Sequence, residues 1–420
     1  MTALRPSDES EGKELIDVVK VAFSGAVGAI GIAVSGGSDS MALLHLGACA
    51  ASEIGVELHA VTIDHRLRPE AAAEASHVRD VCEALKVRHD TLAWDHGEIS
   101  GNLSDQARRA RYRLISEWAR TQGVTHVALG HTADDQAETF LMELAREAGL
   151  DGLSGMRSRW TENGLTWLRP LLETPRQSLR DYLVRQAVAW KDDPTNEDQK
   201  YQRVRARRAL KALSPLGISA TTIASVAGHL ADARRVLETA VADAKRPGAR
   251  EDAGAIFLDH ARFLLLDPEL QRRLLIGALR CVSGAAYSPR SASIKRALGA
   301  LVAGRRATLS GCLLSLKGGE ACILREPKAV ADHTTASDVP WDGRWLLNGP
   351  HAPGLVAKAL GESGLDQCKG WRSVGLPRDV LIVSPAIWQD ATLIAAPVAG
   401  MHHGWTATLL PERSFFAGSH

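Results

Sequence analysis

Up to about residue 150, short apolar runs alternate with longer stretches in which apolar positions recur every three or four residues. The runs include "AIGIAVS" at 29–35, "LHAVTIDH" at 58–65 and "HVALGH" at 126–131. The stretches between them, such as "DSMALLHLGACAASE" at 39–53, have the period of amphipathic helices. This alternation predicts an α/β fold, a parallel sheet with helices on both faces, with any ligand site at the carboxyl ends of the strands.

The pattern changes after residue 150. A helix entered through Thr174 and Pro175 is expected in "RQSLRDYLVRQ", and residues 219–330 are expected to be largely helical. A linker-like stretch from 325 to 343 leads into a small segment rich in Gly, Pro and Trp. We therefore expect a catalytic domain over 1–215, a mainly helical domain over 216–330 and a small mixed domain over 331–420. The tryptophans after residue 340 suit either base stacking or a small core.

Composition narrows the class of protein only slightly. The chain has 420 residues, a formal net charge of +1 and six cysteines without a C-x-x-C pair. Neither a zinc ribbon nor a redox dithiol is indicated, and any nucleic-acid binding must come from local basic clusters. The polar first residues and the lack of a long apolar run predict a cytoplasmic protein with no membrane segment.

The stretch "SGGSDS" at 35–40 joins an expected strand to an expected helix. Gly36 and Gly37 permit a tight turn, and the backbone N–H groups at the helix start form an anion site. Three serine hydroxyls add donors for a polyphosphate, and Asp39 is suited to bind Mg²⁺ between itself and phosphate oxygens. The motif matches neither the lysine-containing phosphate loop nor the dinucleotide fingerprint. A plain Ser/Gly turn that caps the helix is the alternative.

Paired carboxylates follow the third apolar run. Asp135 and Glu138 lie three residues apart in "DDQAETFLMEL", so they share one helix face and suit a substrate with an ammonium group. The alternative is a helix cap, because Thr132 and Asp135 match the capping-box pattern, and both roles can coexist. His131 ends the preceding strand and is expected at the same rim, where it could touch a nucleotide or coordinate Mg²⁺.

Taken together, these motifs resemble the PP-loop ATPases and, within them, the tRNA(Ile)-lysidine synthetases. The resemblance covers about residues 28–215 and rests on the order of "SGGSDS", "IDHRLRPE", "ARRARYRLI", "GHTADDQAET", "RPLLETPRQSLRDYL" and "DDPTNEDQKYQRVRARRAL". It implies an ATP-dependent ligase that joins L-lysine to C2 of the wobble cytidine of an isoleucine tRNA with a CAU anticodon. The cytidine oxygen is first adenylated with release of pyrophosphate, and lysine then displaces AMP. The C-terminal half would contact the tRNA, with the tail on its acceptor region.

The resemblance also implies residue roles. Ser35, Gly36, Gly37, Ser38, Asp39 and Ser40 would hold the ATP phosphates, with Mg²⁺ on Asp39, and Asp135 and Glu138 would recognise lysine. Arg111 would neutralise phosphate charge, and His131 would act at the adenylate. The basic stretch "KYQRVRARRALK" at 200–211 has two roles. Arg205 is the favoured ATP contact, and Arg203, Arg207, Arg208 and Lys211 would face tRNA, although a merely solvated basic helix is the alternative.

Two positions depart from the family pattern. Thr132 stands where many members have a second histidine, and Glu147 and Ala148 interrupt an R-G-[ST]-G pattern, so no family role is transferred to these residues. Two other functions compete with the ligase, a tRNA thiolase with the same loop and a degenerate ATP-dependent RNA-binding module. The oligomeric state is open, with a homodimer as one option.

Overall fold

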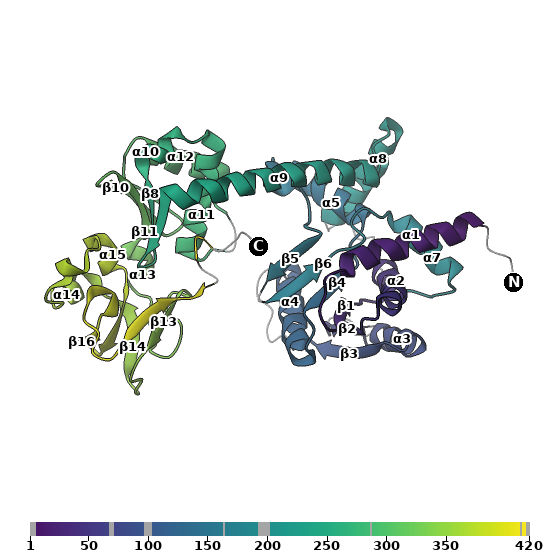
Figure 1. The fold of residues 1–420 in the computed structure, drawn as a ribbon, viewed down its shortest axis with the longest axis horizontal. Helices are drawn as coiled ribbons and strands as arrows, with labels where there is room; N and C mark the ends of the chain where they lie inside the picture. Colours follow the sequence, from purple (N-terminus) through teal and green to yellow (C-terminus); the bar gives the residue numbers. More distant parts are fainter. Residues whose placement is uncertain are drawn as a thin grey trace. The chain divides into compact units, whose positions relative to one another are not determined.

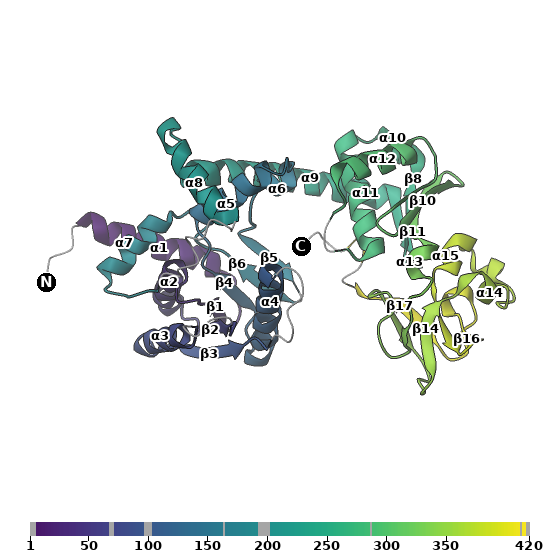
Figure 2. The same cartoon turned by 180° about the vertical axis from the view of Figure 1, so that it is seen from behind.

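The computed structural model describes residues 6–66, 71–95, 103–162, 164–191, 202–285, 288–411 and 414–416. Parts of two motifs, residues 67–70 and 192–201, lie outside the described residues. The chain divides into two compact units at residues 235/236, within helix α9 (Ala220–Gly248). Figure 1 and Figure 2 show the elements of each unit from opposite sides.

Unit 1 is built on one six-stranded sheet in the order β3-β2-β1-β4-β6-β5. The strands are β1 (Ile30–Ala33), β2 (Leu58–Asp64), β3 (Arg88–Ala93), β4 (His126–Leu129), β5 (Arg159–Glu162) and β6 (Leu165–Leu168). The helices are α1 (Pro6–Phe23), α2 (Ser38–Ile54), α3 (Ala71–Ala84), α4 (Leu103–Gln122), α5 (Ala133–Leu144), α6 (Leu150–Leu153), α7 (Arg176–Arg185) and α8 (Gln202–Leu213). All strand pairs are parallel except β5 with β6.

Two apolar clusters cover the two faces of this sheet. On one face, Ile30 and Ile32 of β1 pack with side chains of α1, α2, α3 and α7. On the other face, Val61 and Val127 pack with Ile115 and Trp118 of α4. Successive side chains of a strand point to opposite faces of the sheet, so each buried strand contributes side chains to both clusters. The predicted parallel sheet with helices on both faces is confirmed, and α4 lies opposite α2 and α7 in Figure 1.

Unit 2 contains a five-stranded antiparallel sheet in the order β7-β8-β11-β10-β9. Its strands are β7 (Ala249–Asp252), β8 (Ala255–Asp259), β9 (Ala307–Leu309), β10 (Cys312–Lys317) and β11 (Glu320–Arg325), and its helices are α10 (His260–Leu265), α11 (Pro268–Ser283) and α12 (Ser291–Val302). Residues 216–330 therefore hold strands that the sequence analysis did not include, in addition to the expected helices. One face of the sheet packs against α11 and α12.

The C-terminal segment packs on the other face of that sheet. It comprises α13 (Pro327–Val330), β12 (Thr335–Ala336), β13 (Trp345–Asn348), β14 (Leu355–Ala359), α14 (Gly361–Leu365), α15 (Arg378–Ile382), β15 (Pro385–Gln389), β16 (Thr392–Ala395), β17 (Thr406–Leu409) and short 3₁₀ turns. Trp341, Trp345, Trp388 and Trp405 are buried there, in one cluster with Phe257 of β8. These four indoles serve a core and are not available for base stacking.

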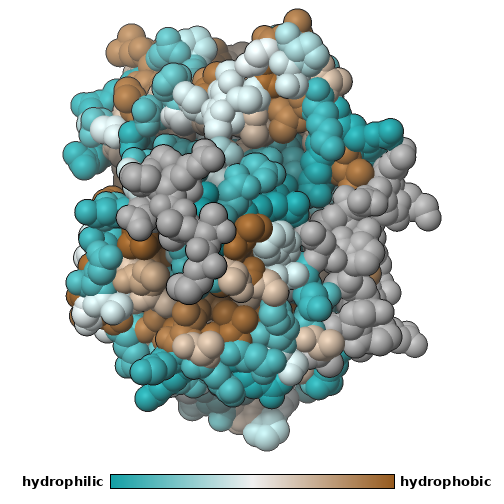
Figure 3. Space-filling view, turned by 90° about the vertical axis from the view of Figure 1, so that its right-hand side faces the viewer, coloured by the Kyte–Doolittle hydropathy of each residue, from teal (hydrophilic) through white to brown (hydrophobic). Residues whose placement is uncertain are grey.

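Large apolar side chains are exposed at several separate positions of unit 1. Val21 and Val27 are 73% and 79% exposed, at the end of α1 and in the turn before β1. The face of this unit seen in Figure 3 is mostly hydrophilic, with hydrophobic residues gathered near its lower middle. Within the described residues, no single helix is long and apolar enough to cross a membrane, and only the bent pair 202–216 with 220–248 meets that test jointly.

Candidate active site

The loop between β1 and α2 has the shape that its sequence predicts. Gly36 has φ +85°, a left-handed conformation that favours glycine, and α2 begins at Ser38. The backbone N–H of Ser35 donates to Ser40 Oγ at 3.1 Å, and Ser40 Oγ donates to the carbonyl of Gly37 at 3.0 Å. Ser40 therefore braces the turn from inside, so that the backbone at the start of α2 can face a phosphate.

Gly130 brings the end of β4 against this loop. A Cβ atom at this glycine would lie 2.9 Å from the carbonyl oxygen of Asp39 and 2.9 Å from Ser40 Cα. Both are backbone atoms that cannot rotate away, so a larger residue would push β4 and α2 apart. The close approach places the start of α5, three residues after Gly130, next to the phosphate loop.

Three carboxylates converge at this rim on one guanidinium, that of Arg176. Arg176 Nε donates to Asp39 Oδ2 at 2.8 Å, its Nη2 lies 3.3 Å from Asp135 Oδ1, and its Nη1 lies 3.6 Å from Glu138 Oε1. The predicted metal ligand and the two predicted lysine-binding acids are therefore neighbours. Arg176 itself was not singled out from the sequence.

Asp135 uses its two carboxylate oxygens differently. Oδ2 accepts hydrogen bonds from the backbone N–H and the hydroxyl of Thr132, both at 3.0 Å, which is the capping-box contact. Oδ1 faces Arg176 and, at 3.8 Å, Arg203 Nη1. The predicted capping contact is present, and the other oxygen of the same side chain faces two arginines.

Helix α8 brings further arginines to the carboxylates. Arg207 donates from Nε to Glu138 Oε1, and Arg203, one turn earlier, faces Asp135. Val204 and Ala206 are buried. Arg205, Arg208 and Lys211 are exposed on α8. The stripe of Arg203 and Arg207 thus contacts the acids directly, whereas Arg205, the favoured ATP contact, contacts none of the three carboxylates in the described structure.

Burial and charge set the ionisation of these acids. Burial raises the pKa of Asp39 and of Glu138 above the usual range, despite the opposing charges of Arg176 and Arg207. Burial acts in the same direction on Asp135, but Arg176 and the other neighbours outweigh it, so the pKa of Asp135 lies below its usual value. The acids also raise the pKa of Arg176, although burial alone would lower it.

His131 is half-buried and held by Arg169. Arg169 Nε donates to His131 Nδ1 at 3.1 Å, which makes Nδ1 an acceptor. Burial, aided by the Arg169 charge, lowers the pKa of His131 to about 3, so the ring is neutral near pH 7 and its remaining proton is on Nε2. An N–H at Nε2 is a hydrogen-bond donor and cannot ligate a metal. Of the two roles expected for His131, contact with a nucleotide fits and Mg²⁺ coordination does not.

Arg169 was also missed by the sequence analysis. Its guanidinium donates to the carbonyl of Arg157 at 2.8 Å and to Tyr112 Oη at 3.2 Å, and it stacks 4.0 Å from the ring centroid of Trp160. Arg111, beside Tyr112 on α4, places Nη2 3.4 Å from His65 Nε2, just after β2. Arg111 is therefore at the carboxyl end of β2, on the same rim of the sheet as the loop after β1.

Mg²⁺ fits Asp39 only in combination with phosphate oxygens. Among the described residues no group of three or more His, Cys, Asp and Glu side chains is arranged to hold a metal ion. Mg²⁺ is commonly bound by one or two carboxylates together with substrate phosphates, and Asp39 at the start of the phosphate-loop helix meets that description.

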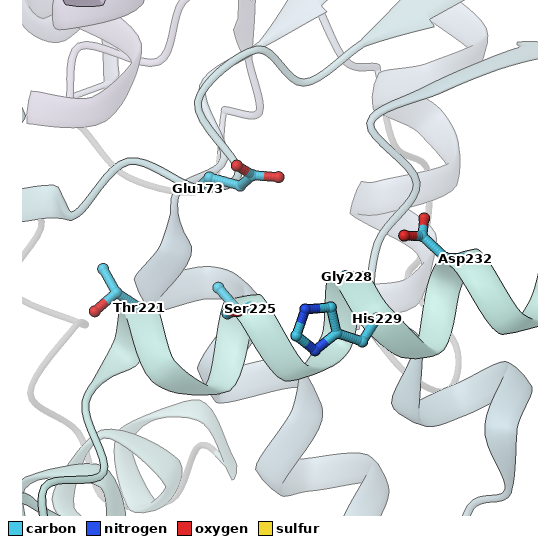
Figure 4. A pocket seen from close by; sticks show the side chains of 7 residues that line it. Glu173, Thr221, Ser225, Gly228, His229 and Asp232 are labelled. Atoms are coloured by element: carbon cyan, nitrogen blue, oxygen red, sulfur yellow. The ribbon is translucent and has the colours of Figure 1, made fainter.

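A separate hollow of about 410 Å³ lies along α9 in unit 1 (Figure 4). Its lining comprises Glu173, Thr221, Ala224, Ser225, Gly228, His229 and Asp232. Glu173 points toward it from the segment before α7, across from the helix. None of the residues predicted as site residues lines this hollow.

The fold and the rim together define the class of this chain. A parallel sheet whose first strand leads into a Ser- and Gly-rich phosphate loop, with acids and arginines gathered at the same strand ends, is the arrangement of a PP-loop nucleotide-binding protein. A family model described as a PP-loop domain matches residues 13–213.

Comparison with curated proteins gives the particular family. The chain is 45% identical over 389 residues to the tRNA(Ile)-lysidine synthase of Ruegeria pomeroyi, and the match covers 92% of this chain and 93% of that relative. It is 37% identical over 317 residues to that of Rhodopseudomonas palustris, covering 72% and 92%. The chain belongs to the tRNA(Ile)-lysidine synthase family. Among solved structures, the U34-tRNA thiolase NcsA from Methanococcus maripaludis aligns at 15% identity and a TM-score of 0.47, covering 53% of this chain and 79% of that one.

Proposed function

We propose that this protein joins L-lysine to C2 of the wobble cytidine in the CAU-anticodon isoleucine tRNA, with conversion of ATP to AMP and pyrophosphate, in the cytoplasm. The observation that carries the proposal is the contact of one guanidinium, that of Arg176, with Asp39, Asp135 and Glu138. The carboxylate at the phosphate loop and the two carboxylates suited to an amine are therefore close enough together for one side chain to contact all three. Such adjacency is what a reaction needs when an amine attacks a carbon activated by the same ATP.

In the first step, the C2 oxygen of the cytidine attacks the α-phosphorus of ATP, and the bond to pyrophosphate breaks. The backbone N–H groups at the start of α2 and the hydroxyls of Ser35 and Ser38 bind the departing pyrophosphate, while Ser40 braces the loop through the Gly37 carbonyl. Mg²⁺ on Asp39 would supply charge neutralisation on the phosphates when bound. His131, just after β4, has a neutral Nε2–H donor, which suits an oxygen of the adenylate.

In the second step, the ε-nitrogen of lysine attacks C2 and AMP leaves with the former C2 oxygen. Asp135 and Glu138 bind the lysine ammonium before attack. The amine must lose a proton to become nucleophilic, and Glu138, whose pKa burial raises, is the better acceptor of the pair. Arg203, Arg207, Arg208 and Lys211 on α8 are proposed to bind tRNA phosphates, and Arg205 to contact ATP.

The thiolase alternative has less support, because such chemistry generally needs reactive thiols near the loop. All six cysteines lie in the described part of the chain, and each is a free thiol. Cys82 is buried in the core of unit 1, and burial raises its pKa to about 12. Its thiol is therefore protonated at neutral pH and a poor nucleophile.

The experiment combines the purified protein with the CAU-anticodon isoleucine tRNA, Mg²⁺, ATP labelled at the α-phosphate and labelled lysine. We expect one AMP and one pyrophosphate for each lysine attached, and no attachment with Asp39→Asn. Cleavage of ATP to ADP, or AMP release without attached lysine, would contradict the proposed reaction.

A further inference from the structure

Arg176 binds three acids with three different nitrogen atoms. Its Nε, Nη2 and Nη1 contact Asp39, Asp135 and Glu138 at 2.8, 3.3 and 3.6 Å. The Arg176 side chain is 19% exposed, and those of the acids are 17%, 9% and 1% exposed. A single protein cation thus occupies the position between the carboxylate proposed for the metal and the carboxylates proposed for lysine.

The backbone position of Arg176 is unfavourable for a cation. Arg176 is the first residue of α7, where the helix dipole is positive and acidic residues are preferred. The backbone N–H of Arg176 donates to Asp134 Oδ2 at 2.8 Å, which fixes this end of the helix beside α5. Attraction to the three carboxylates therefore outweighs the repulsion between the guanidinium and the helix dipole. Because this attraction depends on charge, another cation can take the place of the guanidinium.

Two of the acids have a second cationic partner. Glu138 accepts from Arg207, and Asp135 lies 3.8 Å from Arg203. Asp39 has Arg176 as its only ion-pair partner within the described residues, together with a hydrogen bond from Ser38 Oγ at 3.0 Å. If Arg176 is released, Arg203 and Arg207 still neutralise part of the negative charge of Asp135 and Glu138, whereas Asp39 becomes free to bind a metal.

We propose that Arg176 is a positioning residue that occupies the cation site in the free enzyme. It holds the three carboxylates together, and it yields this place to the lysine ammonium and the metal when substrates bind. This inference rests on the proposed function, because it takes lysine as the incoming cation. It follows that Arg176 competes with lysine and that the position it occupies accepts a guanidinium ion.

The test compares lysine kinetics of the full-length wild type with those of Arg176→Ala. Removal of an internal competing cation should lower the KM for lysine by about fivefold or more, because the ammonium no longer has to displace a guanidinium that pairs with three carboxylates. Added guanidinium chloride at low millimolar concentration should return the KM of the alanine variant to the wild-type value and leave the wild type unchanged. Arg176→Lys, which keeps the charge, should show the wild-type KM.

Arg185→Ala is the matched control, because it removes the same charge from the last turn of the same helix, where Arg185 pairs with Glu11 at 3.2 Å. Its KM for lysine should not change. If Arg176→Ala does not fold, Arg176→Gln gives the same test, since its amide can still hydrogen-bond a carboxylate without a charge. An unchanged or higher KM for lysine, or no response to guanidinium, would overturn the inference. Failure of the wild type to attach lysine would instead overturn the proposed function.

Discussion

At the scale of single residues, Asp135 has both a structural and a proposed chemical role. One carboxylate oxygen caps α5 through Thr132, and the other faces Arg176 and Arg203. Because the two oxygens have separate partners, the roles can be separated by substitution.

Asp135→Asn should raise the KM for lysine about tenfold, since a neutral amide cannot form the charge-assisted hydrogen bond to the ammonium, and should leave the KM for ATP within about twofold. Steady-state kinetics with each substrate varied in turn measures both constants. Thr132→Val is the control: it removes the hydroxyl that donates to Oδ2 and should lower the stability by about 1 kcal/mol without changing the KM for lysine. Equal changes of both KM values in Asp135→Asn would indicate a purely structural role.

His131 makes the stability of the protein depend on pH. Its pKa in the folded state is lowered to about 3 from the usual 6.5, so in acid the unfolded chain binds a proton that the folded chain does not. Stability from this group is therefore present above pH 6.5 and falls as the pH drops below it. Between pH 7.5 and pH 5.5 the decrease is about 1.4 kcal/mol.

His131→Gln should remove this dependence, because glutamine cannot be protonated in this range. Urea unfolding of both proteins at pH 7.5 and pH 5.5 measures it. The free energy of unfolding of the wild type should decrease by about 1.4 kcal/mol more than that of the variant over that interval. Parallel decreases in the two proteins would mean that His131 is not held neutral by burial.

Sequence reasoning found the acids of the site but not all of its cations. The acids and His131 stand in short motifs at expected strand ends. Arg169 directly follows β6, a strand that was not predicted, and Arg176 reaches the rim from the start of α7 through tertiary packing. One local signal did exist for Arg176. A basic residue directly after Thr174 and Pro175, at a helix start where acids are preferred, indicates that anions lie nearby.

At the scale of elements, the site depends on how closely β4 approaches α2. The end of β4 at Gly130 lies against the backbone of Asp39 and Ser40, and this contact sets the distance between the phosphate loop and the acids of α5. The glycine is required here for space.

Gly130→Ala should raise the KM for ATP at least tenfold and lower the stability by about 1 to 3 kcal/mol, because the new methyl group meets rigid backbone. Gly149→Ala is the matched control, since nothing lies within 4 Å of its Cβ position and its φ of −80° suits any residue. Nucleotide kinetics and thermal unfolding of both variants give the comparison. Wild-type ATP kinetics in Gly130→Ala would contradict the importance of this contact.

The elements themselves were predicted unevenly. The strands and helices of the parallel sheet follow from their apolar period, which is strong in buried strands. The antiparallel sheet of unit 2 was missed, because its edge strands are short and one, "ARED", is polar. A hairpin signal was present: Gly318 and Gly319 both have positive φ between β10 and β11, and a Gly-Gly pair between two apolar runs is typical of a two-residue hairpin turn.

At the scale of the whole molecule, a net charge of +1 gives no general attraction to tRNA. Binding must come from local basic surfaces such as the exposed Arg208 of α8 and the nearby Lys211. The expected separate C-terminal domain instead shares a core with the sheet of unit 2, as Trp345 and Phe257 show. The amino-acid composition changes near residue 330, where Gly, Pro and Trp become frequent. Only the packing in the structure shows that the segments before and after this point bury one another's apolar surface.

Arg208→Ala with Lys211→Ala should weaken tRNA binding and reduce the slope of log K against log salt concentration by about 0.8 for each phosphate that the variant no longer neutralises. Filter binding over a series of salt concentrations measures the slope. Arg88→Ala, at the amino end of β3 and so at the opposite rim from the site, should leave it unchanged. An unaltered slope in the double variant would place the tRNA elsewhere on the molecule.

The central claim joins reaction and substrate choice, so the most direct test measures both. Labelled lysine is supplied with ATP and Mg²⁺ to the purified protein and either the CAU-anticodon isoleucine tRNA or a methionine tRNA with the same anticodon. The account predicts lysine attached to the wobble cytidine of the isoleucine tRNA and little or none on the methionine tRNA. Failure to label the isoleucine tRNA, or equal labelling of both, would contradict it.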